Sequence, residues 1–107
     1  MTRGATPAIG GQALTEGPLF VSPALLDGIP PSARIMNEET FGPEMAIAAS
    51  GSDRELLAPA NAVPYGLAAY VYSRDLKRAW AFADRLETGG VGTNVNDVTE
   101  LQAPSGG

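Results

Sequence analysis

Residues 67–95 alternate between the patterns of a strand, a helix and a second strand, and this order restricts the fold more than any other feature of the chain. Leu67 to Tyr72 has the β-branched and aromatic content that favours a strand. Asp75 to Glu87 predicts a helix, and Val91 to Val95 supplies the second strand. The helix has apolar residues at helical spacing, namely Leu76, Ala79, Ala83 and Leu86. This order implies a right-handed crossover between parallel strands.

The first half of the chain predicts elements of the same kinds. Phe20 to Leu26 is typical of a short strand, Ser32 to Asn37 of a helical turn, and Met45 to Ala49 of a buried strand. Residues 1–17 favour a loose lead-in. The predicted fold class is therefore α/β, a mostly parallel sheet with flanking helices. We expect residues 1–107 to form one domain, because this length suffices for one small domain.

A further helix is predicted between these two regions. Ser52-Asp53-Arg54-Glu55 matches a capping box, in which the Ser52 hydroxyl accepts from the Glu55 amide and the Glu55 carboxylate reaches back. Pro59 lies inside the span that follows, and a proline there removes one backbone hydrogen bond at a cost of roughly 3 kcal/mol or more. We expect this helix to be kinked or short.

The cluster Glu38-Glu39-Thr40-Phe41-Gly42-Pro43 has two interpretations. It could simply end a helix in a turn, since Pro43 forces Gly42 into an extended conformation. It also resembles the E-x-F-G-P signature of the aldehyde dehydrogenases. Other segments resemble landmarks of that family in the same order: Gly10-Gly11 through Leu26, Asn61 through Ala69 (N-x-x-x-Y-G-L-A-A), Val91 through Asn94 (V-x-x-N) and Ala103 through Gly107 (A-P-F-G-G). These landmarks cover essentially the whole chain and favour the second interpretation.

The resemblance implies a partial aldehyde dehydrogenase catalytic domain, and the motifs resemble most those of the succinate-semialdehyde dehydrogenase branch. In that family the Glu at the position of Glu39 hydrogen-bonds the nicotinamide-side ribose of NAD or NADP. The Phe at the position of Phe41 packs beside that ribose and the nicotinamide. A carboxylate suits this role because it only accepts hydrogen bonds and can take both hydroxyls of a ribose diol. Glu39 and Phe41 are therefore the predicted cofactor-binding residues.

The loop after the last strand lines the substrate tunnel in the family. This makes Asn96, Asp97, Val98 and Ser105 the predicted contacts to the aldehyde, although a solvated surface loop is an equal alternative for any one of them. Ser105 stands where the family commonly has Phe. Loss of that ring either opens the tunnel to a more polar aldehyde or marks an altered chain end.

The chain contains no Cys and no His. The resemblance implies that a thiolate attacks the aldehyde and that hydride passes to NAD(P), so we predict no catalytic residue and no metal site in this chain. The pairs Gly10-Gly11 and Gly89-Gly90 lack the G-x-G-x-x-G spacing of a dinucleotide site. We expect this chain to be part of an oxidoreductase that oxidises an aldehyde to a carboxylic acid. The chain by itself should be inactive. A non-catalytic, self-associating α/β module is the alternative.

The formal net charge of -5 argues against nucleic acid as a partner, because phosphate binding depends on clustered Lys and Arg. No apolar stretch approaches the roughly 20 residues that cross a bilayer. We therefore expect no nucleic-acid and no membrane partner, a small-molecule aldehyde as substrate, a homo-oligomer, and a cytoplasmic location.

Overall fold

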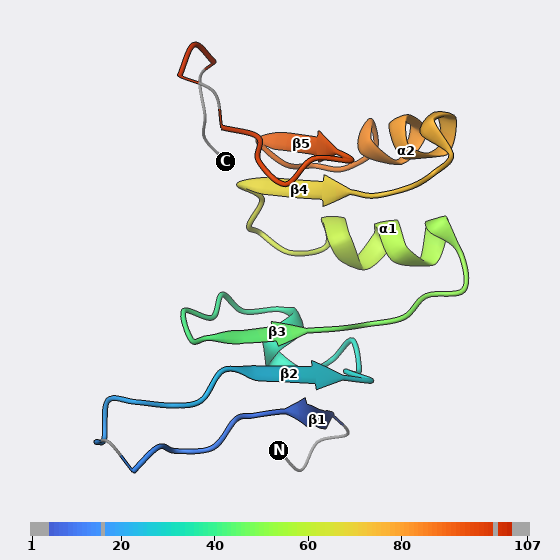
Figure 1. The fold of residues 1–107 in the computed structure, drawn as a ribbon. Helices are drawn as coiled ribbons and strands as arrows, with labels where there is room; N and C mark the ends of the chain where they lie inside the picture. The colour runs from blue at the N-terminus through green and yellow to red at the C-terminus, as the bar shows by residue number, and fades with distance from the viewer. Residues whose placement is uncertain (1–4, 16, 100, 104–107) are drawn as a thin grey trace. The chain divides into compact units, whose positions relative to one another are not determined.

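The computed structural model describes residues 5–15, 17–99 and 101–103. The chain divides into two compact units, Met1–Ala49 and Ser50–Gly107. Figure 1 shows the elements of each unit in chain order. Each unit is described by itself.

The first unit contains a three-stranded sheet and one helical turn. Its strands are β1 (Thr6–Ile9), β2 (Ala24–Asp27) and β3 (Glu44–Ala46), in the order β1-β2-β3. β1 pairs antiparallel with β2, and β2 pairs parallel with β3. The predicted helical turn is the 3₁₀ helix η1 (Arg34–Met36).

Strand β1 lies in the stretch that was predicted to be a loose lead-in, and that prediction is wrong for these residues. The glycines after β1 explain the difference, because Gly10 and Gly11 have φ angles of 72° and 80°. A Cβ at Gly10 would also clash with the carbonyl oxygen of Pro23. Glycine therefore allows the chain to turn closely against the segment that leads into β2, where β1 finds its partner.

The other two strands of this unit are shorter than predicted. Pro23 has no N–H to donate, and β2 begins only after it, at Ala24. Val21 makes just an isolated bridge with Ala13. β3 ends at Ala46, with Ile47 donating one further hydrogen bond to Leu26.

The second unit has the predicted strand–helix–strand order. It consists of α1 (Asp53–Asn61), β4 (Ala68–Val71), α2 (Leu76–Ala83) and β5 (Gly90–Thr93). β4 and β5 are parallel and in register from Ala68↔Gly90 to Val71↔Thr93, so the parallel crossover is confirmed. Of the three strand pairings in the described residues two are parallel, and they belong to two separate sheets.

Capping side chains start both helices. The Ser52 hydroxyl accepts from the Glu55 amide as predicted, at 3.2 Å, and Asp75 accepts from the Arg78 amide at 3.0 Å. The Glu55 carboxylate reaches one residue further back than expected, to the amide of Gly51. Helix α1 is short, with Pro59 near its end, as predicted.

Helix α2 ends four residues earlier than predicted. Beyond Ala83, the Arg85 carbonyl and the Glu87 amide bond to the side chain of Asn61, at 2.7 and 3.0 Å. The Gly89 amide donates instead to Gly66. The Glu87 and Gly89 amides therefore bond outside the helix, while the Arg85 and Leu86 amides still bond back to Phe82 and Ala83.

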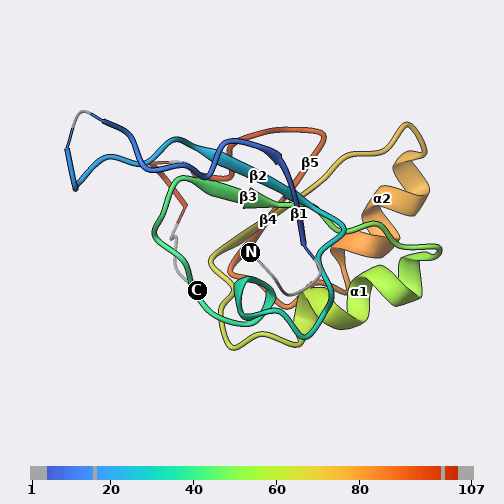
Figure 2. The same cartoon turned by 90° about the horizontal axis from the view of Figure 1, so that it is seen from below.

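The two helices lie next to each other (Figure 2). Arg78 of α2 makes two hydrogen bonds with Asp53 of α1, at 2.9 and 2.6 Å, and Asn61 binds the chain beyond α2. Because the first residues of α1 face the first turn of α2 and the last residue of α1 faces the segment after it, the helices run in the same direction.

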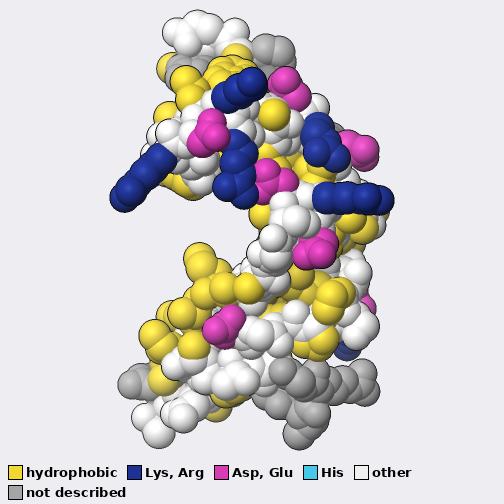
Figure 3. Space-filling model, turned by 90° about the vertical axis from the view of Figure 1, so that its right-hand side faces the viewer, with side chains coloured by type: hydrophobic (Ala, Val, Ile, Leu, Met, Phe, Trp, Pro, Cys, Tyr) yellow, Lys and Arg dark blue, Asp and Glu magenta, His cyan; other side chains and the backbone are white. Residues whose placement is uncertain are grey.

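Little of the apolar surface is buried. Among the described residues the buried hydrophobic side chains are Ile29, Leu57, Ala79 and Ala83. Trp80, on α2, is 57% exposed. Figure 3 shows hydrophobic side chains at the surface of both units.

Candidate functional site

A short polar loop between η1 and β3 carries the predicted cofactor residues. Arg34 holds Glu38 through two hydrogen bonds of 2.9 and 2.8 Å, and this ion pair lowers the pKa of the Glu38 carboxyl. The Asn37 side chain donates to the carbonyls of Pro31 and Ala33. These bonds tie the start of the loop to the helical turn before it.

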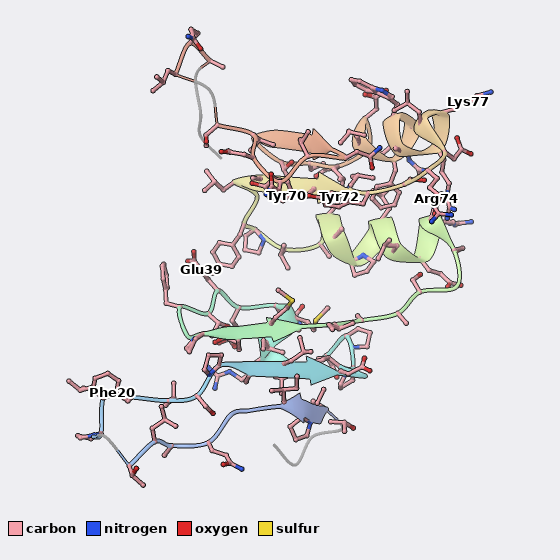
Figure 4. All side chains as sticks on the ribbon, in the orientation of Figure 1. Phe20, Glu39, Tyr70, Tyr72, Arg74 and Lys77 are labelled. Atoms are coloured by element: carbon pink, nitrogen blue, oxygen red, sulfur yellow. The ribbon has the colours of Figure 1, made fainter. Side chains whose placement is uncertain are left out.

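Glu39 follows directly and is exposed (Figure 4). No hydrogen bond or ion pair within the described residues involves its carboxylate. With Arg34, Ile35, Glu38 and Thr40 it lines an open pocket of about 280 Å³. An acceptor beside a guanidinium suits a ligand that carries hydroxyl or anionic groups.

The structure does not bring Phe41 into this pocket. The Phe41 side chain is 94% exposed, on the same loop as Glu39 but beyond the pocket lining. An aromatic ring left so open on a loop has its whole apolar face available to a ligand or to another part of a protein.

The predicted substrate loop turns back along its own unit. Asn94, directly after β5, has a φ of 55° and reverses the chain. This reversal places Val98 over two glycines of β5, where its side chain is half-buried. A Cβ at Gly90 would lie 3.6 Å from Val98 Cγ2, and one at Gly92 would lie 3.0 Å from Val98 Cγ1.

The other predicted residues of this loop are placed differently. Asn96 is exposed. Asp97 accepts from the Thr99 amide at 2.8 Å and from the Thr99 hydroxyl at 2.5 Å, and these bonds lower the pKa of its carboxyl. Ser105 lies outside the described residues. Asp97 thus stabilises a local turn, while Asn96 is open to a ligand.

Sequence reasoning missed the residues that hold this loop. Tyr72 donates through its hydroxyl to the Val95 carbonyl at 2.7 Å, and the Asn94 side chain bonds to the backbone of Ser73. A Cβ at Gly92 would lie within 3.0 Å of Val95, Tyr70 and Val98 side-chain atoms. The available signal was the family pattern V-x-x-N, which contains Asn94 but does not indicate its partners.

A second pocket, of about 250 Å³, lies between α1, β4 and α2. Tyr70, Tyr72 and Phe82 form much of its wall, and the aromatic pair from the β4 segment is visible in Figure 4. Its charged lining residues, Asp53 and Arg78, are already paired with each other, and Arg78 lowers the pKa of the Asp53 carboxyl. This pocket therefore offers apolar and phenolic groups and no free charged group.

The chain has no thiol and no imidazole. Within residues 5–15, 17–99 and 101–103, no three His, Cys, Asp or Glu side chains gather as metal ligands. In the same part of the chain, no helix has both the length and the apolar content to span a bilayer.

Comparison with known proteins matches the aldehyde dehydrogenase family over residues 1–107. The non-phosphorylating aspartate-semialdehyde dehydrogenase of Halomonas elongata is 40% identical over 107 residues, which is all of this chain and 22% of that protein. The NADP(+) succinate-semialdehyde dehydrogenase GabD of Escherichia coli is 37% identical over the same length and is likewise covered to 22%.

A crystal structure of succinate-semialdehyde dehydrogenase from Burkholderia pseudomallei superposes with a TM-score of 0.89 at 41% identity, covering 96% of this chain and 21% of that one. The chain thus spans about a fifth of the length of the relatives that it matches. The resemblance found in the sequence is confirmed: this chain belongs to the aldehyde dehydrogenase family.

Proposed function

We propose that this chain is the part of an NAD(P)-dependent aldehyde dehydrogenase that contributes to cofactor binding and to the aldehyde pocket. The protein as a whole would oxidise an aldehyde to a carboxylic acid. The observation that carries this proposal is Glu39, an exposed carboxylate without a partner among the described residues, on a loop that matches the family signature. Its neighbour Glu38, in contrast, is held by Arg34.

The chemical groups of Glu39 and Phe41 fit a nicotinamide nucleotide. The Glu39 carboxylate can accept both hydroxyls of a ribose diol, and the open Phe41 ring can pack against a flat apolar surface. A nicotinamide cofactor supplies the hydride acceptor that aldehyde oxidation requires. NAD and NADP both remain within the proposal, and the name of the Escherichia coli relative specifies NADP(+).

The chemical step needs a group that this chain lacks. Oxidation through a thioester begins with a thiolate, and the 107 residues contain no Cys. The nucleophile would therefore come from a segment outside this chain. The proposed role of the chain is to bind and orient the cofactor and the aldehyde.

The aldehyde class in this proposal is a semialdehyde. Two of the relatives are named for succinate semialdehyde and one for aspartate semialdehyde. We assign the contacts to Asn96, Asp97, Val98 and Ser105. Of these, Asn96 offers an exposed amide and Val98 a partly covered apolar side chain.

Self-association and a cytoplasmic location belong to the same proposal. Two observations support self-association. Apolar side chains are exposed, and β4 pairs only with β5 among the described residues, so its other edge is open. They also favour the alternative of a non-catalytic, self-associating module. Enzyme activity of a complete protein distinguishes the two.

The test compares two neighbouring glutamates in a full-length aldehyde dehydrogenase that carries this chain, for example with the remaining sequence of the Escherichia coli relative. Glu39→Gln should raise the KM for NAD(P) or lower kcat by about tenfold, because an amide holds a ribose diol less well than a carboxylate does. Glu38→Gln is the matched control and should change either constant by less than about threefold, since its loss affects a surface ion pair. Equal effects of both variants, or no effect of Glu39→Gln, would exclude Glu39 from the cofactor site.

A further inference from the structure

Asn94 acts as a side-chain extension of the β4–β5 pairing. The strands end at the pair Val71↔Thr93, and the Asn94 amide then donates to the Val71 carbonyl at 2.8 Å. The Asn94 Oδ1 accepts from the Ser73 amide at 2.9 Å, and Nδ2 donates to the Ser73 carbonyl at 3.0 Å. The side chain thus satisfies both backbone groups of Ser73 with the donor and the acceptor of one amide.

The residue after Asn94 is held by a separate bond. The Tyr72 hydroxyl donates to the Val95 carbonyl at 2.7 Å, from the segment between β4 and α2 that also contains Ser73. The loop beyond is fixed by packing, because Val95 and Val98 occupy the space over Gly92 where a side chain would stand. The loop that begins with Asn96 therefore starts from a clamped position.

We propose that Asn94, assisted by Tyr72, is a positioning residue that sets the direction of the aldehyde-contacting loop, residues 96–98. This inference rests on the proposed function, because it gives meaning to a loop assigned there to the substrate. Asn94 touches neither substrate nor cofactor in this proposal. It acts by keeping the loop in one arrangement, so that little ordering remains to be done when an aldehyde binds.

The size of the effect follows from the fraction of time that the loop spends in the competent arrangement. Apparent affinity falls in proportion to that fraction, so a loop that is correctly placed one tenth of the time binds about tenfold more weakly. Two neutral hydrogen bonds, each worth about a factor of two to ten, are enough to produce this change. Among the described residues the Asn94 side chain bonds to Ser73 alone, and the cofactor loop around Glu39 belongs to the other unit.

A simpler role for Asn94 predicts a different result. Its φ of 55° lies in the left-handed region, which asparagine tolerates better than most residues. If backbone tolerance were the whole role, Gly would replace Asn94 without loss, because Gly adopts this conformation freely. The clamp requires the side-chain amide, which Gly does not have.

The experiment measures Asn94→Gly, Asn94→Ala and Tyr72→Phe in the full-length enzyme that carries this chain. We expect Asn94→Gly and Asn94→Ala to raise the KM for the aldehyde about tenfold and Tyr72→Phe about threefold, with the KM for NAD(P) changed less than about twofold. Tyr65→Phe is the matched control for Tyr72→Phe, since its hydroxyl makes no hydrogen bond within the described residues. A wild-type aldehyde KM in Asn94→Gly would overturn the inference.

Amide hydrogen exchange provides a readout that does not depend on activity. In Asn94→Gly the Ser73 amide loses its acceptor, and its exchange should accelerate about tenfold, while Tyr72→Phe should leave it unchanged. Unchanged exchange of Ser73 in Asn94→Gly would overturn the clamp even if the enzyme were inactive. If substitutions at Asn96 and Val98 leave the aldehyde KM unchanged while Asn94→Gly still accelerates exchange, the proposed substrate loop fails and the clamp stands.

Discussion

Three asparagine side chains in this chain replace backbone partners: Asn37, Asn61 and Asn94. An amide carries one strong acceptor and two donors, so it can satisfy an N–H and a C=O of another segment at once. Asn61 does this for Glu87 and Arg85, and Asn94 does it for Ser73. Asn61 and Asn94 also belong to the segments that resemble family landmarks. At both positions the structure supplies a folding reason for a residue that sequence patterns alone associate with the family.

At the same scale, the turn formed by Asp97 predicts a pH dependence. Hydrogen bonds from the Thr99 hydroxyl and amide lower the pKa of the Asp97 carboxyl, so the ionised form stabilises the turn. This contribution is complete above the ordinary Asp pKa of about 3.9 and is lost as the pH falls through the lower pKa of the folded chain. Thr99→Val should raise the pKa of Asp97, because it removes the hydroxyl donor.

Carboxyl chemical shifts in NMR would measure this pKa, at concentrations below those at which the chain associates. Thr40→Val is the matched control, since Thr40 makes no hydrogen bond to Asp97. The assignment of the low pKa to the Thr99 hydroxyl is wrong if Thr99→Val titrates like the unaltered chain.

Among the elements, the two helices show how tertiary contacts override local signals. Helix α1 starts at its capping serine and ends two residues after Pro59, so its sequence largely determines its extent. Helix α2 has a capping aspartate at its start, but its end depends on Asn61 and Gly66, which lie outside it. Asn61 binds the Glu87 amide and the Arg85 carbonyl, and Gly66 accepts from the Gly89 amide, so these backbone groups are not available to a longer helix.

The place of Pro59 predicts a gain of stability on substitution. Pro59→Ala restores a backbone donor at the seventh position of a nine-residue helix. It should therefore raise the free energy of unfolding by about 1–3 kcal/mol. Urea denaturation followed by circular dichroism would measure the change. Pro64→Ala, beyond the end of α1, is the matched control and should give no helical gain. An unchanged or lowered midpoint for Pro59→Ala would show that the proline fits this helix without cost.

For the molecule as a whole, the exposed area is large for the mass. The chain exposes 8446 Å², whereas a compact protein of 11.0 kDa exposes about 5,600 Å². Even two compact bodies of half that mass, without mutual contact, would expose about 6,800 Å². Leu19, at 92% exposed, and Leu67, at 66%, are among the apolar side chains that account for this excess.

The isolated chain should therefore self-associate as its concentration rises, because exposed apolar surface and unpaired strand edges favour contacts between copies. Light scattering together with binding of a hydrophobic dye would detect this. The double variant Leu19→Ser and Leu67→Ser should shift association to a higher concentration. A monomer at high concentration that binds no dye would mean that the chain is a self-sufficient domain.

The isolated chain should also show no oxidation of a semialdehyde with NAD or NADP, because it has no thiolate to begin the reaction. Formation of the reduced cofactor is the measurement, with a reaction lacking protein as the blank. Cofactor reduction above that blank would mean that another group in these residues performs the chemistry.

The sequence alone determined the class of the fold, the family, the start of α1 and the position of the candidate cofactor loop. These follow from local signals: apolar periodicity, a capping serine, a proline inside a helix, and the sequence motif that contains Glu39 and Phe41. Only the tertiary structure decided that residues 6–9 form a strand, that α2 ends at Ala83, and that Asn94 and Tyr72 hold the loop after β5. Each of these depends on hydrogen bonds between residues more than ten positions apart, whose partners cannot be identified from local patterns because the fold itself brings them together.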